Sequence, residues 1–168
     1  EIQPRRARGE QRLLGIARAA QVPVALAAIP AALEQSLVDA VARSGIATVV
    51  QHGYAHRNHA PEGARKRELG ADRPVAAALA ELEQGRVALA EKFGGRFAAV
   101  LVPPWNRIAS EVVARLPAAG FLGLSAFGPR AAAHPVPGIL QCNTHVDPVA
   151  WRAGRAFVGV DAALDSLI

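Results

Sequence analysis

The chain has 168 residues, of which 51% are hydrophobic and 20% are charged. This balance excludes a disordered polymer and a coiled coil, and it predicts one globular domain over residues 1–168. The formal net charge of +5 raises the question of an anionic partner. The basic clusters around Arg5 and Arg65 contain no aromatic side chains that stack on bases, so we expect no nucleic-acid partner.

The first part of the chain predicts helices and strands in alternation. Residues 13–17 carry apolar side chains at helical spacing, and residues 31–44 carry them on one face before Gly45, which has the position of a C-terminal cap. The apolar runs 22–29 and 46–51 predict buried strands, and the second leads directly into His52. Residues 60–73 are charged and contain glycine, which predicts an exposed loop.

The same alternation continues to the end of the chain. A helix is expected over residues 74–93, and a strand over residues 97–102 that Pro103 stops. A helix over residues 108–119 then precedes a fourth strand over residues 121–125. Further strands are expected over residues 139–146 and 157–160, and a final helix near Ala162.

Short apolar strands that alternate with longer helices are typical of α/β proteins with parallel strands. The strands are almost continuously apolar, which predicts that both faces of the sheet are covered. A doubly wound sheet and a (β/α) barrel share this pattern, so the periodicity leaves both open.

No apolar run approaches the roughly 18 residues of a membrane-spanning helix, because the run 22–29 ends at Pro30. The first residues are basic and polar without a following apolar stretch of the signal-peptide type. We therefore expect no membrane partner. The compartment stays open, with the cytoplasm slightly favoured, and so does the oligomeric state.

Polar side chains follow the second, third and fifth predicted strands at the point where each strand ends. In parallel α/β folds, ligand sites lie at these carboxyl ends. We therefore expect His52, Trp105 and Asp147, one from each strand end, to converge.

His52 and His56 have the i, i+4 spacing that lets two imidazoles hold one divalent ion. The pair lacks the glutamate of the H-E-x-x-H metalloprotease motif, so a base has to come from elsewhere. Two polar loop histidines without a metal are the alternative interpretation.

The fifth predicted strand has one polar face. Gln141, Asn143, His145 and Asp147 share that face, and Cys142 lies on the apolar one. A barrel interior that opens into a polar pocket explains this alternation, and a wet edge strand is the alternative. In this interpretation, Cys142 is a small core residue rather than a nucleophile.

Two other enzyme classes find little support. The segment 123–128 superficially resembles a nucleophile elbow, but its second glycine comes one position too late for G-x-S-x-G. No phosphate-cradling glycine pattern precedes a predicted helix. A serine hydrolase and a nucleotide-dependent enzyme are therefore not expected.

Taken together, three segments resemble the NodB-homology polysaccharide deacetylases over roughly residues 22–151. His52 and His56 match the histidine pair of the second motif of this family, which serves a zinc ion. Residues 102–105 are similar to its third motif, a groove-lining loop of the arginine-x-proline-tyrosine type. Asp147 followed by Trp151 is similar to its fourth motif.

The chain also departs from the family pattern. Val102 stands where the family has arginine, and Ala150 where it has a second aspartate. The family's first motif, a strand with paired aspartates, has no counterpart, because no aspartate precedes Asp39. Its last motif, a histidine strand, would lie beyond Ile168. We expect either the core of a longer protein or a degenerate member of the family.

The resemblance implies an irregular parallel (β/α) barrel, incomplete at both ends in this chain. It implies a hydrolase that removes acetyl groups from N-acetylated sugars or polysaccharide, with zinc or another divalent metal as cofactor. A barrel that binds glycans without cleaving them is the alternative function.

The resemblance also implies site residues. His52 and His56 would bind the metal. His59 and Asp147 are the internal candidates for a third ligand, although neither matches the family position. His145 and Asp147 would be catalytic, although a structural histidine bonded to Asp147 is an equal alternative for His145. The expected substrate contacts are Pro104, Trp105, Asn106, Arg107 and Trp151. The two tryptophans would stack on sugar rings, or belong to the core.

Overall fold

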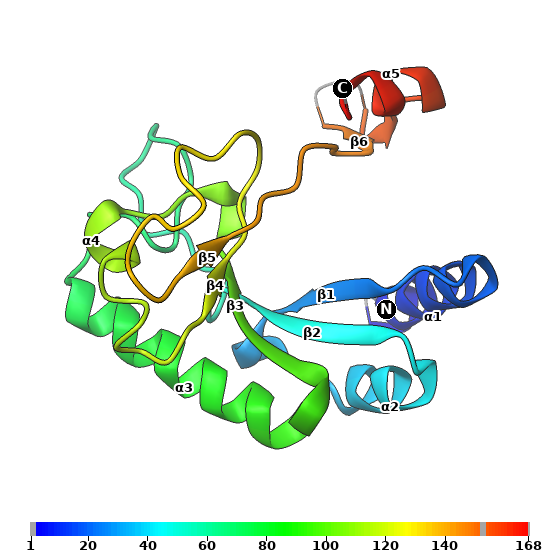
Figure 1. Cartoon of the computed structure of the whole chain (residues 1–168), viewed down its shortest axis with the longest axis horizontal. Helices are drawn as coiled ribbons and strands as arrows, with labels where there is room; N and C mark the ends of the chain where they lie inside the picture. The colour runs from blue at the N-terminus through cyan, green and yellow to red at the C-terminus, as the bar shows by residue number, and fades with distance from the viewer. Residues whose placement is uncertain (1–2, 152–153, 168) are drawn as a thin grey trace.

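The structure is a computed structural model that describes residues 3–151 and 154–167. Five strands form one parallel sheet, and their order across the sheet follows their order in the chain (Figure 1). The strands are β1 (Val24–Ala28), β2 (Ala47–His52), β3 (Phe97–Val102), β4 (Gly123–Leu124) and β5 (Leu140–Gln141). A doubly wound sheet reverses its strand order, whereas a barrel does not. The sheet therefore has barrel-type winding, and it is not closed within the described residues.

Helices cover one face of this sheet. In Figure 1, α2 (Gln35–Ser44) and α3 (Val75–Phe93) lie below the strands, and both contact β2. Helix α1 (Gln3–Ala20) packs on α2, which ends at Gly45 in the left-handed conformation expected of a C-terminal cap. None of the helices in the described ranges is long and apolar enough to cross a membrane.

The core lies between the sheet and these helices. Val49 and Leu101 point from the sheet to this side and are fully buried with Leu82 and Leu89 of α3. The opposite face is less covered, because Ala25 and Ala27 of β1 are exposed. The expectation that both faces are covered is therefore wrong at β1 for the part of the chain that the structure describes.

The last strands and helices differ most from the sequence prediction. Helix α4 is limited to Ser110–Val113, and turns replace the rest of the predicted helix. Pro117 explains this, because proline disfavours helical backbone at the residue before it and cannot donate an N–H. Strand β5 ends at Gln141, so most of the predicted strand 139–146 is irregular.

The chain ends in a hairpin and a short helix. Strand β7 (Ala156–Phe157) pairs antiparallel with β6 (Val149–Ala150), and α5 (Val160–Asp165) comes after it. Figure 1 shows this segment apart from the sheet, at the end of an extended connection. Of the expected sixth strand 157–160, Phe157 alone lies in a strand, and this strand does not join the parallel sheet.

The segment 60–73, which was expected to be an exposed loop, is partly buried. Glu68, Leu69 and Gly70 are all buried. Leu69 forms a parallel bridge with Ile108, and its carbonyl accepts a hydrogen bond from the Ala109 N–H at 2.8 Å. The segment therefore packs against the loop after β3, and the prediction of an exposed loop was wrong for residues 68–70.

A glycine of α3 allows close packing against the end of β2. A Cβ on Gly85 would lie 2.6 Å from Gln51 Nε2 and 2.7 Å from Pro30 Cγ. We predict that Gly85→Ala lowers the free energy of unfolding by about 1 to 2 kcal/mol, because overpacking outweighs the gain in helix propensity. Gly15→Ala in α1, where no atom lies within 4 Å of the added Cβ, should stabilise instead. Urea denaturation of the two variants checks this, and equal effects would contradict it.

Candidate functional site

His52 is the last residue of β2 and is partly buried. Its Nδ1 lies 2.9 Å from the Val102 carbonyl oxygen on the neighbouring strand. Because a carbonyl oxygen can only accept a hydrogen bond, the proton lies on Nδ1 and the lone pair on Nε2. Metal-ligating histidines commonly have this arrangement, with one ring nitrogen held by a backbone carbonyl and the other free for the ion.

The surroundings of His52 also favour its neutral form. Burial lowers its pKa from the ordinary value of 6.5, and the positive charge that His56 can carry lowers it further. The hydrogen bond to Val102 and the carboxylate of Glu68 act in the opposite direction but do not reverse the shift. A neutral imidazole near pH 7 is the form that binds metals.

His56 lies next to His52 and to an aromatic side chain. The centroids of the two imidazole rings are 5.1 Å apart, and the Trp105 ring centroid lies 4.3 Å from that of His56. The structure thus brings together two of the three expected strand ends, through His52 and His56 after β2 and Trp105 after β3.

Three residues of this site have a strained backbone. His56, Trp105 and Asn106 have φ values of 53°, 56° and 57°. The left-handed conformation costs an L-residue other than glycine roughly 1 to 2 kcal/mol, and least for asparagine. Such strain gathers at functional sites when the surrounding structure holds it in place. Here it presents the Trp105 ring to His56.

Glu68 is a residue of this site that the sequence patterns did not predict. Its side chain is fully buried, and its carboxylate accepts hydrogen bonds from the backbone N–H groups of Tyr54 (3.2 Å), Ala55 (2.8 Å) and Arg57 (3.4 Å). The amides of Tyr54 and Ala55 belong to the turn that connects the two histidines, and that of Arg57 follows His56 directly. Nothing in the charged segment 62–68 distinguishes this glutamate from its neighbours.

Gly53 makes room for this carboxylate. A Cβ on Gly53 would overlap Glu68 Oε2 and would lie 2.6 Å from Pro104 Cγ. The φ of Gly53 is 58°, a conformation that side chains also disfavour. A glycine directly after a strand-terminal histidine is the one sequence signal that could have indicated a close approach here.

His59, a candidate third ligand, has a different partner. Its Nε2 lies 3.0 Å from Arg73 Nη1, and the same Nη1 donates to Glu81 Oε2 at 2.8 Å. Arginine only donates, so His59 Nε2 is the acceptor and its lone pair is occupied. Among the described residues, no three His, Cys, Asp or Glu side chains are arranged to hold a metal ion. The pair His52 and His56 therefore fits two positions of a metal site.

The expected groups from the region after β5 form a separate cluster. Asp147 Oδ1 accepts the Val149 N–H at 2.9 Å, and Oδ2 accepts the Trp151 Nε1–H at 2.6 Å. The guanidinium of Arg155 lies 5.9 Å from the centre of the Trp151 ring. His145 is exposed. The contacts of Asp147 thus tie it to the β6–β7 hairpin and not to His52 or Trp105.

The remaining expected substrate contacts divide into two kinds. Pro104 is buried against Gly53, and Arg107 donates from Nη1 to the Lys66 carbonyl at 2.9 Å, so both hold loops together. Asn106 is exposed and lines a cavity of about 370 Å³ on the open face of the sheet.

This cavity corrects the prediction for the residues after β5. Cys142 and Thr144 line it, together with Val50, Val102 and Ser125. The face that was expected to be polar turns away: Asn143 accepts the Ala126 N–H at 2.9 Å and donates to the Gly128 carbonyl at 2.8 Å. Cys142 is exposed and is not a core residue. The alternation itself continues to Thr144, which forms a parallel bridge with Phe127. The prediction was wrong about which of the two faces lines the cavity.

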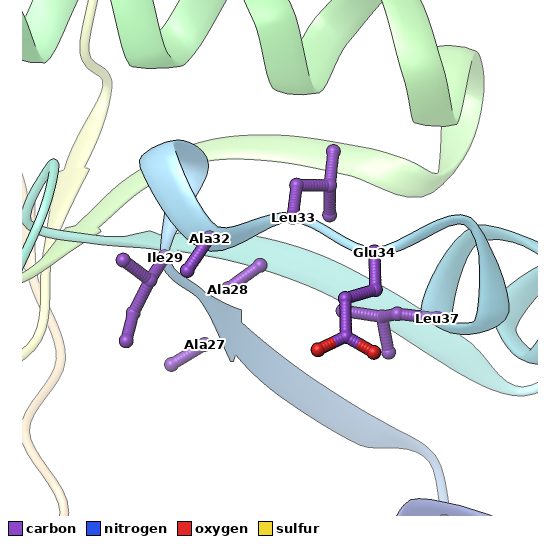
Figure 2. A pocket seen from close by; sticks show the side chains of 7 residues that line it. All are labelled: Ala27, Ala28, Ile29, Ala32, Leu33, Glu34 and Leu37. Atoms are coloured by element: carbon purple, nitrogen blue, oxygen red, sulfur yellow. The ribbon is translucent and has the colours of Figure 1, made fainter. Parts of the chain in front are cut away.

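A second cavity, of about 230 Å³, lies where β1 ends (Figure 2). It shares Ala27 with the first cavity, and its charged lining group is the carboxylate of Glu34. The expected site residues do not line it.

Comparisons with known proteins bear on the fold. No family model and no curated protein matches the sequence. Among solved structures, the chain is similar to one described as "Crystal structure of putative polysaccharide deacetylase from Mycobacterium smegmatis", with a TM-score of 0.63 and 19% sequence identity. The match covers 94% of this chain and 56% of that chain. The chain therefore has the α/β fold of the polysaccharide deacetylase type, and it spans about half the length of the structure it matches.

The low pKa of His52 has a consequence for stability. Because the pKa of His52 is lower in the folded than in the unfolded chain, protonation of His52 favours unfolding. The stability that neutral His52 contributes is present above pH 6.5 and is lost as the pH falls through the folded pKa. We predict that the free energy of unfolding decreases between about pH 7.5 and pH 5.5, and decreases less in a His52→Gln variant. Urea denaturation at both pH values measures this. The same decrease in both proteins would show that His52 is not the source of this pH dependence.

Proposed function

We propose that this chain carries part of the site of a metal-dependent hydrolase that removes acetyl groups from N-acetylated sugars. One observation carries the proposal: His52 and His56 face each other at the carboxyl end of a parallel strand, and the Nδ1 bond to Val102 leaves Nε2 of His52 free for an ion. The deacetylase-type fold supports the choice of reaction class.

In this proposal, His52 and His56 hold the metal, each through one ring nitrogen. A divalent metal such as zinc supplies Lewis acidity and a nucleophilic water near neutral pH. Trp105 offers an apolar ring face for a sugar, and Asn106 offers an amide at the rim of the neighbouring cavity. We assign no step to His145 or Asp147, whose catalytic roles stay predictions.

A glycan-binding module without catalysis is the second candidate. It is favoured by Asp147, whose two carboxylate oxygens are already occupied by the Val149 N–H and the Trp151 Nε1–H. The hydrophobic residues Val102 and Ala150, at positions where deacetylases of this family have charged ones, point in the same direction.

The first test of the proposal is metal binding. We predict that the chain binds zinc weakly, because two histidines supply fewer than the three protein ligands of an ordinary hydrolytic zinc site. His52→Ala and His56→Ala should each abolish this binding. His134→Ala is the matched control, since His134 bonds to the Ile139 carbonyl in another loop. Calorimetric titration measures the affinities, and equal zinc binding by all four proteins would refute the site.

The second test is the reaction. With excess zinc, we predict slow acetate release from N-acetylglucosamine oligomers that depends on both histidines, and a raised KM in Trp105→Ala. Oligomer binding without histidine-dependent acetate release would replace the hydrolase with the glycan-binding module. If the chain neither binds the oligomers nor releases acetate from them, the proposed substrate class is wrong.

A further inference from the structure

We propose that Glu68 is a positioning residue: its buried carboxylate fixes the turn between His52 and His56 and thereby sets the affinity of the histidine pair for a divalent metal. The inference rests on the proposed function, because it takes the pair to be a metal site. Glu68 forms no hydrogen bond with either imidazole in the described residues. Its carboxylate acts through the backbone amides of the turn.

The turn between the histidines is shaped around this carboxylate. The N–H groups of Tyr54, Ala55 and Arg57 point to it, with Oε2 facing the first and Oε1 the other two. Successive backbone amides that converge in this way form a concave site for an anion. Here the chain supplies the anion itself, from a residue 11 to 14 positions further along.

The buried carboxylate has its partners in the backbone. A fully buried carboxylate is unfavourable unless its oxygens are well satisfied. The ion pairs of the described residues join Arg67 to Asp72 and Arg73 to Glu81, so the partners of Glu68 are backbone amides. Hydrogen bonds from backbone N–H groups to a charged acceptor are stronger than neutral ones, and they fix the backbone rather than a side chain.

The turn holds a strained backbone in place. The residues at its two ends, Gly53 and His56, both have left-handed backbones with φ of 58° and 53°. The amides bound by Glu68 lie between them and directly after His56. Without the carboxylate, these amides lose their acceptor, and the strained conformation that directs the His56 ring towards His52 loses its support.

Glu68 also connects the turn to the loop after β3. Leu69, its neighbour, is bound to that loop through the Ala109 N–H at 2.8 Å. Glu68 and Pro104 both pack on Gly53. Glu68 and its neighbour Leu69 therefore contact both the histidine turn and the loop after β3, which carries Trp105.

The experiment compares the variants Glu68→Leu and Glu68→Gln with the unmodified chain. Glu81→Gln is the matched control. Glu81 lines the same small cavity of about 70 Å³ and loses the same charge, but it accepts its hydrogen bond from Arg73 rather than from the turn. Two quantities are measured: hydrogen exchange of the Tyr54 and Ala55 amides, and zinc affinity by calorimetry. Circular dichroism confirms that each variant is folded.

We expect faster exchange of both amides in Glu68→Leu, and zinc affinity about 10- to 100-fold lower, the usual range for residues that orient metal ligands. Glu68→Gln keeps one acceptor oxygen and should lie between Glu68→Leu and the unmodified chain. Glu81→Gln should match the unmodified chain in both quantities. If Glu68→Leu does not fold, Gly53→Ala, whose added methyl group displaces the same carboxylate, should show both effects.

Unchanged exchange in a folded Glu68→Leu variant would overturn the positioning role. Faster exchange with unchanged zinc affinity would overturn the link to the metal. If the unmodified chain binds no zinc at all, the proposed function fails together with that link, while the exchange measurement still decides whether Glu68 holds the turn.

Discussion

The candidate site depends on one interaction, the capture of three backbone amides by the buried carboxylate of Glu68. The amides of Tyr54, Ala55 and Arg57 have to converge for these hydrogen bonds to form, and this requires a residue without a side chain at position 53. The turn then places His56 beside His52. Parallel strand pairing contributes the other constraint, because it puts the Val102 carbonyl where it fixes the ring of His52.

The rings of the two histidines are oriented by different interactions. His52 is held by burial and a hydrogen bond; the bond sets its tautomer, and burial keeps its pKa below the ordinary value. His56 has a strained backbone, and its ring contacts that of Trp105, whose backbone is strained as well. Strain of this kind persists only where neighbouring groups determine the conformation completely. The buried carboxylate and the close packing of Pro104 on Gly53 meet that condition.

Local sequence patterns predicted the parallel strands, the helices between them and the histidine pair. Apolar periodicity indicated the elements, and the spacing of His52 and His56 indicated the pair. Glu68 could not be found in this way, because its partners are backbone amides, which every residue except proline has. The prediction for the residues after β5 was wrong for another reason: the alternation continues to Thr144, which bridges Phe127, but alternation alone does not tell which face lines a cavity. The partners of Asp147 are set by a hairpin that has no strong sequence signal.

The proposed metal site requires that Nε2 of His52 is free to bind an ion while Nδ1 stays bonded to Val102. Long-range nitrogen–proton NMR spectra of the histidine rings, recorded near neutral pH before and after zinc addition, test this most directly. We expect His52 to start with its proton on Nδ1, and zinc to shift the Nε2 resonance and leave Nδ1 protonated. A proton on Nε2 before zinc, or ring resonances of His52 and His56 that zinc does not change, would contradict it.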